Sequence, residues 1–137
     1  MKLKSFAIAL LFSCSTVLVS AQSPSELTKY VEALSFDCPV DLGNGWVAQS
    51  YDINDNNVII TIIGDFPDSY FNELGVHSDS IKAKFLNGAG QINPAWQQLL
   101  SLTCGASSTL VIDLLSSSGA ATVEIVCSPS EIADALK

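Results

Sequence analysis

The chain has 137 residues, 48% of them hydrophobic, and 14 acidic residues against six basic ones give a net charge of −8. This length supports one domain with a modest core. All six basic residues are lysines, so binding to nucleic acid or to an anionic membrane surface is disfavoured, because both require a basic face.

The first 21 residues have the pattern of a secretory signal peptide. Lys2 and Lys4 precede an apolar stretch that closes on Val19-Ser20-Ala21, a small-residue cleavage pattern. A permanent membrane helix fits less well, because polar residues at 13–16 interrupt a run that is already short for a bilayer. We therefore expect residues 22–137 to form one exported domain, periplasmic or secreted, in which four lysines and 14 acids leave a net charge of −10.

A lipoprotein is the alternative form of export. The segment Leu11-Phe12-Ser13-Cys14 loosely resembles a lipobox, in which Cys14 would be acylated. Phe12 is bulky for that motif, and apolar residues continue beyond it to Val19. Contact with a membrane is expected only in this lipidated form.

The tetrapeptide SPSE occurs at Ser23–Glu26 and again at Ser128–Glu131. In each copy the first serine can cap a helix, proline suits the first helical position, and the glutamate can bond back to the cap. Apolar residues at helical spacing follow each copy. The repeat therefore predicts two helix starts rather than a catalytic serine.

Two β-hairpins are predicted between these helices. Residues 46–51 and 58–63 flank the turn-rich NDNN, and residues 109–115 and 121–127 flank a serine-rich turn. The strand at 58–63 is apolar on both faces, which predicts a covered central strand or one that meets a partner. A helical region at 69–86, broken near Gly75, and a helix from Asn93-Pro94 to Gly105 lie between the hairpins.

This order predicts an α+β fold: an antiparallel sheet of two hairpins, about four strands, with helices packed mainly on one face. Leu34–Cys38 (LSFDC) and Leu100–Cys104 (LSLTC) both end a helix before a hairpin, which indicates an αββ pseudo-repeat. Residues 22–137 would then be a single domain built from two related halves.

Three cysteines, Cys38, Cys104 and Cys127, follow the signal peptide. An odd number in an oxidising compartment predicts one disulfide and one thiol. Loop-closure entropy does not decide between Cys38–Cys104 and Cys104–Cys127. The pseudo-repeat favours Cys38–Cys104, with Cys127 as a buried apolar residue of the last strand.

Catalytic motifs are absent from the sequence, and we assign no catalytic, cofactor-binding or metal-binding residue. The one histidine, His77, would have to serve any triad, but Ser78, Asp79 and Ser80 beside it have the pattern of helix caps. No cofactor is expected.

The turn of the first hairpin partly matches a calcium-binding loop. Asp52, Asn54 and Asn56 match its first three ligand positions, but Asn57 stands where glycine is needed and Ile63 where glutamate is needed. A polar hairpin turn explains these residues better.

The loop that follows the first hairpin is the candidate contact surface. It contains Phe66, Pro67, Tyr70 and Phe71, and aromatic residues beside proline and acids are common at interfaces. The alternative is that Phe66 and Phe71 only cover the end of the sheet.

The segment CPVDLGNGWVAQSYDINDNNVIITI (38–62) and the tail GAATVEIVCSPSEIADAL (119–136) resemble a group of small exported proteins of unknown function from Bacteroides-type bacteria. The resemblance is carried mainly by Cys38-Pro39-Val40, Leu42-Gly43 and the final strand, proline and helix. It implies export and an α+β fold and carries no site residue.

Three hypotheses on function follow. The first is a non-catalytic exported binding or envelope-associated domain that contacts a protein, favourably a basic one, through its acidic surface or the 65–71 loop. The second is an inhibitor or immunity-type protein that neutralises a basic toxin or hydrolase. The third is a small hydrolase that uses His77. The oligomeric state is left open.

Overall fold

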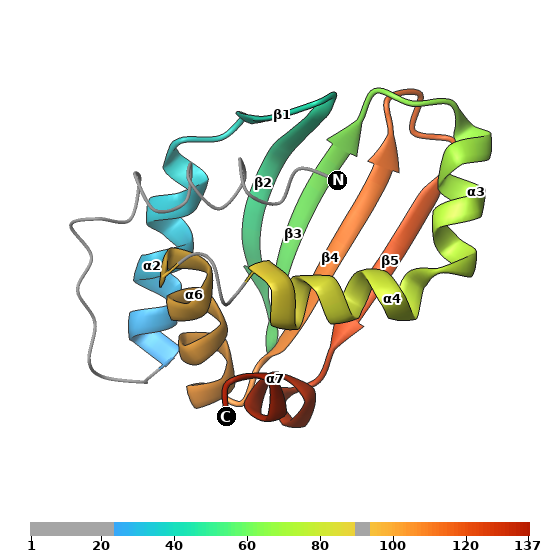
Figure 1. Ribbon diagram of the computed structural model, residues 1–137. Coiled ribbons are helices and arrows are strands. Elements are labelled where there is room, and N and C mark those ends of the chain that lie inside the picture. The colour runs from blue at the N-terminus through green and yellow to red at the C-terminus, as the bar shows by residue number, and fades with distance from the viewer. Residues whose placement is uncertain (1–23, 90–93) are drawn as a thin grey trace.

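The computed structural model describes residues 24–89 and 94–137. The signal peptide, Cys14, Ser23 of the first SPSE and Asn93 lie outside the described residues. The elements run in the order α2 (Pro24–Phe36), β1 (Val40–Gly43), β2 (Trp46–Asn54), β3 (Asn57–Gly64), α3 (Asp68–Val76), α4 (Ser78–Ala83), the π-helix η1 (Lys84–Ala89), α6 (Pro94–Gly105), β4 (Thr109–Ser116), β5 (Thr122–Cys127) and α7 (Pro129–Ala135) (Figure 1).

The strands form one five-stranded sheet in the order β1-β2-β3-β4-β5. The antiparallel pairs β2–β3 and β4–β5 confirm both predicted hairpins. β3 and β4 run parallel, however, so the sheet is mixed and not antiparallel throughout. Parallel neighbours need a long crossover, and residues 68–105 supply it by returning the chain to the end of the sheet where β3 began.

The fifth strand, β1, was missed by the sequence analysis, which expected about four. It pairs antiparallel with the start of β2, with Val40 opposite Ala48 and Gly43 opposite Trp46. The connecting residues Asn44 (φ 54°) and Gly45 (φ 89°) both lie in the left-handed region. Asparagine and glycine adopt that region most readily, so Asn-Gly was the sequence signal for this turn.

The described helices lie on one face of the sheet (Figure 1). Successive side chains of a strand point to opposite faces, and burial alternates accordingly along β3, β4 and β5. The face under the helices supplies these buried residues: Val58, Ile60, Ile62, Leu110, Ile112, Leu114, Val123, Ile125 and Cys127. The other face is left partly exposed.

The helices contribute the predicted apolar stripes to this core. On α2 the stripe consists of Leu27, Tyr30, Val31 and Leu34, and on α6 of Trp96, Leu99, Leu100 and Thr103, all of them buried. The indole Nε1 of Trp96 donates a hydrogen bond of 2.6 Å to the carbonyl of Phe85, which ties α6 to η1. No helix within the described residues is both long and apolar enough to cross a membrane.

The helical region after the first hairpin breaks at His77, two residues beyond Gly75, which confirms the predicted break near that glycine. His77 (φ −107°, ψ 24°) ends α3 and precedes α4, while Gly75 lies inside α3. A Cβ on Gly75 would have Val123 Cγ2 at 4.0 Å as its nearest neighbour. This glycine is therefore tolerated within the helix and does not mark its end.

The second SPSE forms the predicted capping box. Ser128 Oγ accepts a hydrogen bond of 3.2 Å from the backbone N–H of Glu131, and Glu131 Oε1 accepts one of 2.9 Å from the N–H of Ser128. Pro129 occupies the first turn of α7. Because both hydrogen bonds are made, the second repeat is confirmed as a helix start.

The predicted disulfide between Cys38 and Cys104 is not formed in the structure, where Cys38, Cys104 and Cys127 are thiols. Figure 1 shows why the pseudo-repeat misplaced them: α2 and α6 finish at opposite ends of the strands, α2 beside β1 and α6 where β4 begins. The Cys38 thiol donates to the carbonyl of Leu34, and that of Cys104 to the carbonyl of Pro129. The two helices thus pack side by side in opposite directions.

Candidate functional site

The face of the sheet opposite the helices is the first candidate surface. We call it the open face and define it by alternate residues of β3, β4 and β5: Ile59, Thr61, Ile63, Val111, Asp113, Leu115, Thr122, Glu124 and Val126. These side chains are partly buried or exposed, and Val126 has 42% of its surface exposed. An apolar side chain that protrudes from an uncovered sheet is available for contact with another molecule.

The strand register arranges the open face in three rows that run across the strands. One apolar row contains Ile59, Val111 and Val126, and the other contains Ile63 and Leu115 and ends on Thr122. The polar row between them contains Thr61, Asp113 and Glu124. β2 extends the rows with Val47 opposite Ile63, Ser50 opposite Thr61 and Asp52 opposite Ile59.

The polar row places two carboxylates beside each other. Asp113 and Glu124 are direct cross-strand partners. Partial burial raises the pKa of Asp113, and the nearby charge of Glu124 raises it further. Like charges opposite each other destabilise a sheet, so this pair lowers the stability of the fold.

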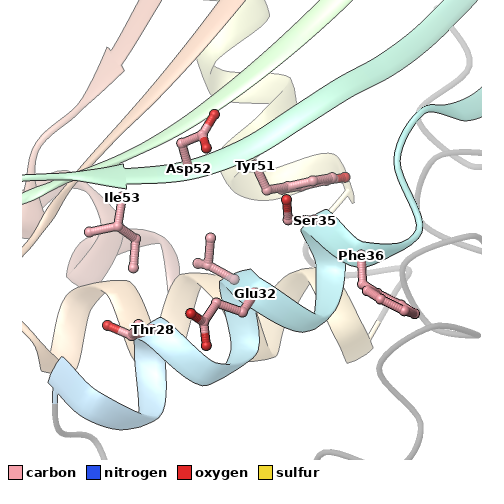
Figure 2. A pocket seen from close by; sticks show the side chains of 8 residues that line it. Thr28, Glu32, Ser35, Phe36, Tyr51, Asp52 and Ile53 are labelled. Carbon is pink, nitrogen blue, oxygen red and sulfur yellow. The ribbon is translucent and has the colours of Figure 1, made fainter.

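A groove of about 430 Å³ lies between α2 and β2 and is the second candidate surface (Figure 2). Its lining residues are Thr28, Val31, Glu32, Ser35, Phe36, Tyr51, Asp52 and Ile53. Phe36 is 90% exposed at the end of α2, and Ile53 is 36% exposed on β2.

The polar groups of this groove do not converge. In Figure 2 the side chain of Ile53 extends from β2 toward α2, while that of Asp52 points away from the helix. Glu32 lies on α2, so the two carboxylates come from different sides of the groove. This arrangement offers apolar contact area but no general acid and base held together on a reacting group.

Another surface hollow, of about 420 Å³, lies where α4, η1 and α7 meet. Lys82 and Glu131 form an ion pair of 2.9 Å at this place. The lysine is therefore engaged in joining two helices, and the hollow has no strong case as a ligand site.

The predicted contact loop is folded around an aromatic cluster at the end of the sheet. The ring of Phe66 lies 5.1 Å from that of Trp46 and 4.8 Å from that of Tyr70, and Phe71 lies 5.9 Å from Trp46. Phe71 is only 1% exposed, Phe66 and Tyr70 are partly buried, and Pro67 is exposed. The loop therefore covers the sheet, and its role in binding stays a prediction that rests on Pro67 and the outer edges of Phe66 and Tyr70.

The candidate residues for catalysis and calcium binding have structural positions in the fold. His77 is exposed, and its backbone N–H and carbonyl bond to Leu74 and Ile81 at the joint of α3 and α4. Among the described residues no group of histidine, cysteine and acidic side chains could hold a metal ion.

The calcium-like turn also has a structural role. The side-chain amide of Asn56 donates to the carbonyl of Ser107 at 2.8 Å and accepts from the hydroxyl of Ser108 at 3.0 Å. The Asn56 carbonyl accepts from the N–H of Thr109 as well. Asn56 thereby fixes the start of β4 beside the β2–β3 turn.

The sequence predicted only part of what the structure shows of the open face. The doubly apolar strand at 58–63 indicated that its second face is either covered or meets a partner. The pairing of that strand with β4 could not be read from the sequence, so the rows were missed, and with them the place of the Asp113–Glu124 pair between two apolar rows.

No family model matches the chain, and no curated protein matches it. Among solved structures it is similar to a chain from Pseudomonas aeruginosa described as a "putative secreted protein", with 17% sequence identity and a TM-score of 0.57. The match covers 83% of this chain and 99% of that one. It supports the α+β fold, and the neighbour is a pseudomonad protein rather than one from the Bacteroides-type group.

Proposed function

We propose that this chain is an exported, non-catalytic binding domain whose partner covers the open face. One observation carries the proposal: β3, at the centre of the sheet, presents Ile59 and Ile63 on the face opposite the described helices. A central strand of this composition is normally covered on both sides. A second protein would complete the cover.

Two further features support export. The first 21 residues match a signal peptide, and the neighbour from Pseudomonas aeruginosa bears the description of a secreted protein. The intact mass of the protein purified from its own envelope tests this point. A chain that starts at Gln22 supports the signal peptide, an acylated Cys14 supports a lipoprotein, and a chain that retains Met1 contradicts both.

The binding role is tested by native mass spectrometry of the tagged protein with two matched variants. Ile59→Thr with Val111→Thr makes the open face polar while keeping β-branched side chains that suit a strand. Phe36→Ser alters the α2–β2 groove instead. We expect the complex to be lost in the first variant and kept in the second, with both variants folded.

Two other outcomes of this experiment would contradict the proposal as stated. A complex that is lost only in Phe36→Ser moves the binding site to the groove. A wild-type chain that is isolated alone, under conditions that keep weak complexes together, contradicts the binding role.

An inhibitor or immunity-type role toward a basic protein is a second candidate. It is favoured by the acidic excess and by the Asp113–Glu124 pair on the face left for contact. Association with such a partner is expected to be fast and to slow steeply with salt. A rate independent of salt would remove this candidate.

A further inference from the structure

We infer that the open face binds a protein segment that places a lysine or arginine on the carboxylates of Asp113 and Glu124 and packs apolar side chains on the two rows beside them. This inference rests on the proposed binding function and specifies its partner. It follows from the register of the strands, the charges that the chain itself provides, and the exclusion of other occupants.

The polar row of Thr61, Asp113 and Glu124 lies between two apolar rows, one on each side along the strands. A bound segment that buries the apolar rows must also cover the carboxylates between them. Burying two carboxylates without a counter-charge is costly, so the segment must bring a cation or hydrogen-bond donors.

The strands of this chain do not provide the cation. None of β1 to β5 contains a lysine, arginine or histidine. Lys82 is paired with Glu131 on the helical side, and Lys137 with Asp134 at the end of the chain. Lys29 and Lys84 lie on α2 and η1, which belong to the helical layer.

The rim of the open face is also acidic. Asp52 of β2 extends the first apolar row, and Asp41 of β1 lies opposite Val47 at the end of the second. Both acids are exposed. Acidic residues thus lie in the middle and at the edge of the face, which is the complement of a basic apolar surface.

The same charges argue against other occupants. A second copy of this chain, stacked face to face, would bring two Asp113–Glu124 pairs together without a cation. An anionic lipid surface or a nucleic acid would meet the same repulsion. Arginine suits the site best, since its planar guanidinium can bond to two carboxylate oxygens at once.

Site-specific photo-crosslinking in the native envelope tests the inference on the full chain. A benzoylphenylalanine replaces one of three residues: Val126 on the open face, Glu32 beside the α2–β2 groove, or Pro67 in the aromatic loop. We expect a protein adduct at Val126 only. Peptide mapping should place it on an apolar segment that contains lysine or arginine.

A second set of variants tests the role of the charges. Asp113→Asn with Glu124→Gln keeps the shape of the polar row and removes both charges. Asp55→Asn with Glu73→Gln removes two charges elsewhere, and asparagine tolerates the left-handed backbone of Asp55 (φ 56°). We expect the Val126 adduct to fall about tenfold or more in the first pair and to be unchanged in the second. Loss of folding is not expected, because the first pair removes a repulsion.

Each of the other possible results contradicts one part of the inference. An adduct at Glu32 or Pro67 but not at Val126 contradicts the open-face site and leaves the binding function standing. A Val126 adduct that survives in the neutral pair contradicts the cation. An adduct of twice the chain's own mass, or one with lipid, contradicts the basic protein partner. No adduct at any of the three positions contradicts the binding function itself.

Discussion

Lys82 and Glu131 lie 49 residues apart in the sequence and join α4 to α7, with Nζ 2.9 Å from Oε2. The second carboxylate oxygen of Glu131, Oε1, accepts the backbone N–H of Ser128 at 2.9 Å. One side chain therefore both caps α7 and holds it against α4. This carboxylate therefore adds to the burial of Ile132, which is 0% exposed, in fixing the position of the last helix.

We predict that Glu131 makes stability depend on pH. The Ser128 N–H and then Lys82 hold its pKa below the ordinary 4.5, so its contribution is fully present above about pH 4.5 and is lost as pH falls through the lower pKa of the folded state. The hydrogen bond to Glu131 raises the pKa of Lys82 above 10.5. The stabilisation from the charged lysine is therefore lost only as pH rises through this raised pKa.

Glu131→Gln tests this dependence. Its amide oxygen can still accept from Ser128, but the charge is lost, and because the pair is partly exposed we expect a loss of about 0.5 kcal/mol at neutral pH. Urea unfolding at a series of pH values should show wild type and variant converging in acid. Asp134→Asn, whose pair with Lys137 is exposed and 3.4 Å long, should have no measurable effect. Parallel curves for wild type and Glu131→Gln would contradict the assignment.

A second prediction concerns the cap of the same helix. Ser128→Ala removes the acceptor for the Glu131 N–H and should cost about 1 kcal/mol of unfolding free energy. Ser117→Ala, an exposed serine in the turn between β4 and β5, is the matched control and should change little. Chemical denaturation measures both. Equal values would mean that water replaces the cap at no cost.

Local patterns predicted the elements of this fold because the interactions behind them are local. The SPSE at Ser128 specifies its helix through hydrogen bonds within four residues, and both hairpins follow from alternation and turn residues. The turn at Asn44-Gly45 was equally readable and was missed only because β1 is short.

The relations between distant elements could not be predicted in the same way. Alternation along β3 does not say which strand lies beside it, and the parallel pairing with β4 depends on how the crossover from α3 to α6 packs. The Asp113–Glu124 pair could be read from its hairpin, but its place beside Thr61 and between apolar rows depends on that pairing. For the same reason the likeness of LSFDC and LSLTC misled: the two similar helix ends lie at opposite ends of the strands.

The cysteines provide a third prediction, in which structure and sequence pattern give opposite results. With Cys38 as a thiol, Cys38→Ser should change the unfolding free energy by less than about 1 kcal/mol. Loss of a native disulfide would cost about 2–5 kcal/mol. Burial, and then the charge of Asp37, raises the pKa of Cys38 to about 11, so alkylation of the native protein at neutral pH should be slow.

Intact mass after alkylation in denaturant provides the control. Three alkyl groups on the mature chain are expected from Cys38, Cys104 and Cys127 as thiols. A single alkyl group, together with a large effect of Cys38→Ser, would show that Cys38 forms a disulfide in the exported protein.

The last prediction concerns the contact of Gly64 with the aromatic cluster beneath the 65–71 loop. A Cβ at this position would lie 2.6 Å from Trp46 Cζ3 and 3.0 Å from Phe66 Cδ2, closer than packed atoms tolerate. Gly64→Ala should therefore cost about 1–3 kcal/mol and change the fluorescence of Trp46 as its ring shifts. Gly75→Ala is the matched control, since its site is open and alanine favours the helix, so it should stabilise the protein by up to about 1 kcal/mol.

If both variants have wild-type stability and fluorescence, the Trp46–Phe66 packing yields easily, and the loop is then free to rearrange around a partner. If Gly64→Ala alone is destabilised, the cluster is a rigid end of the sheet, and contact through this loop is limited to the exposed Pro67 and the outer edges of Phe66 and Tyr70.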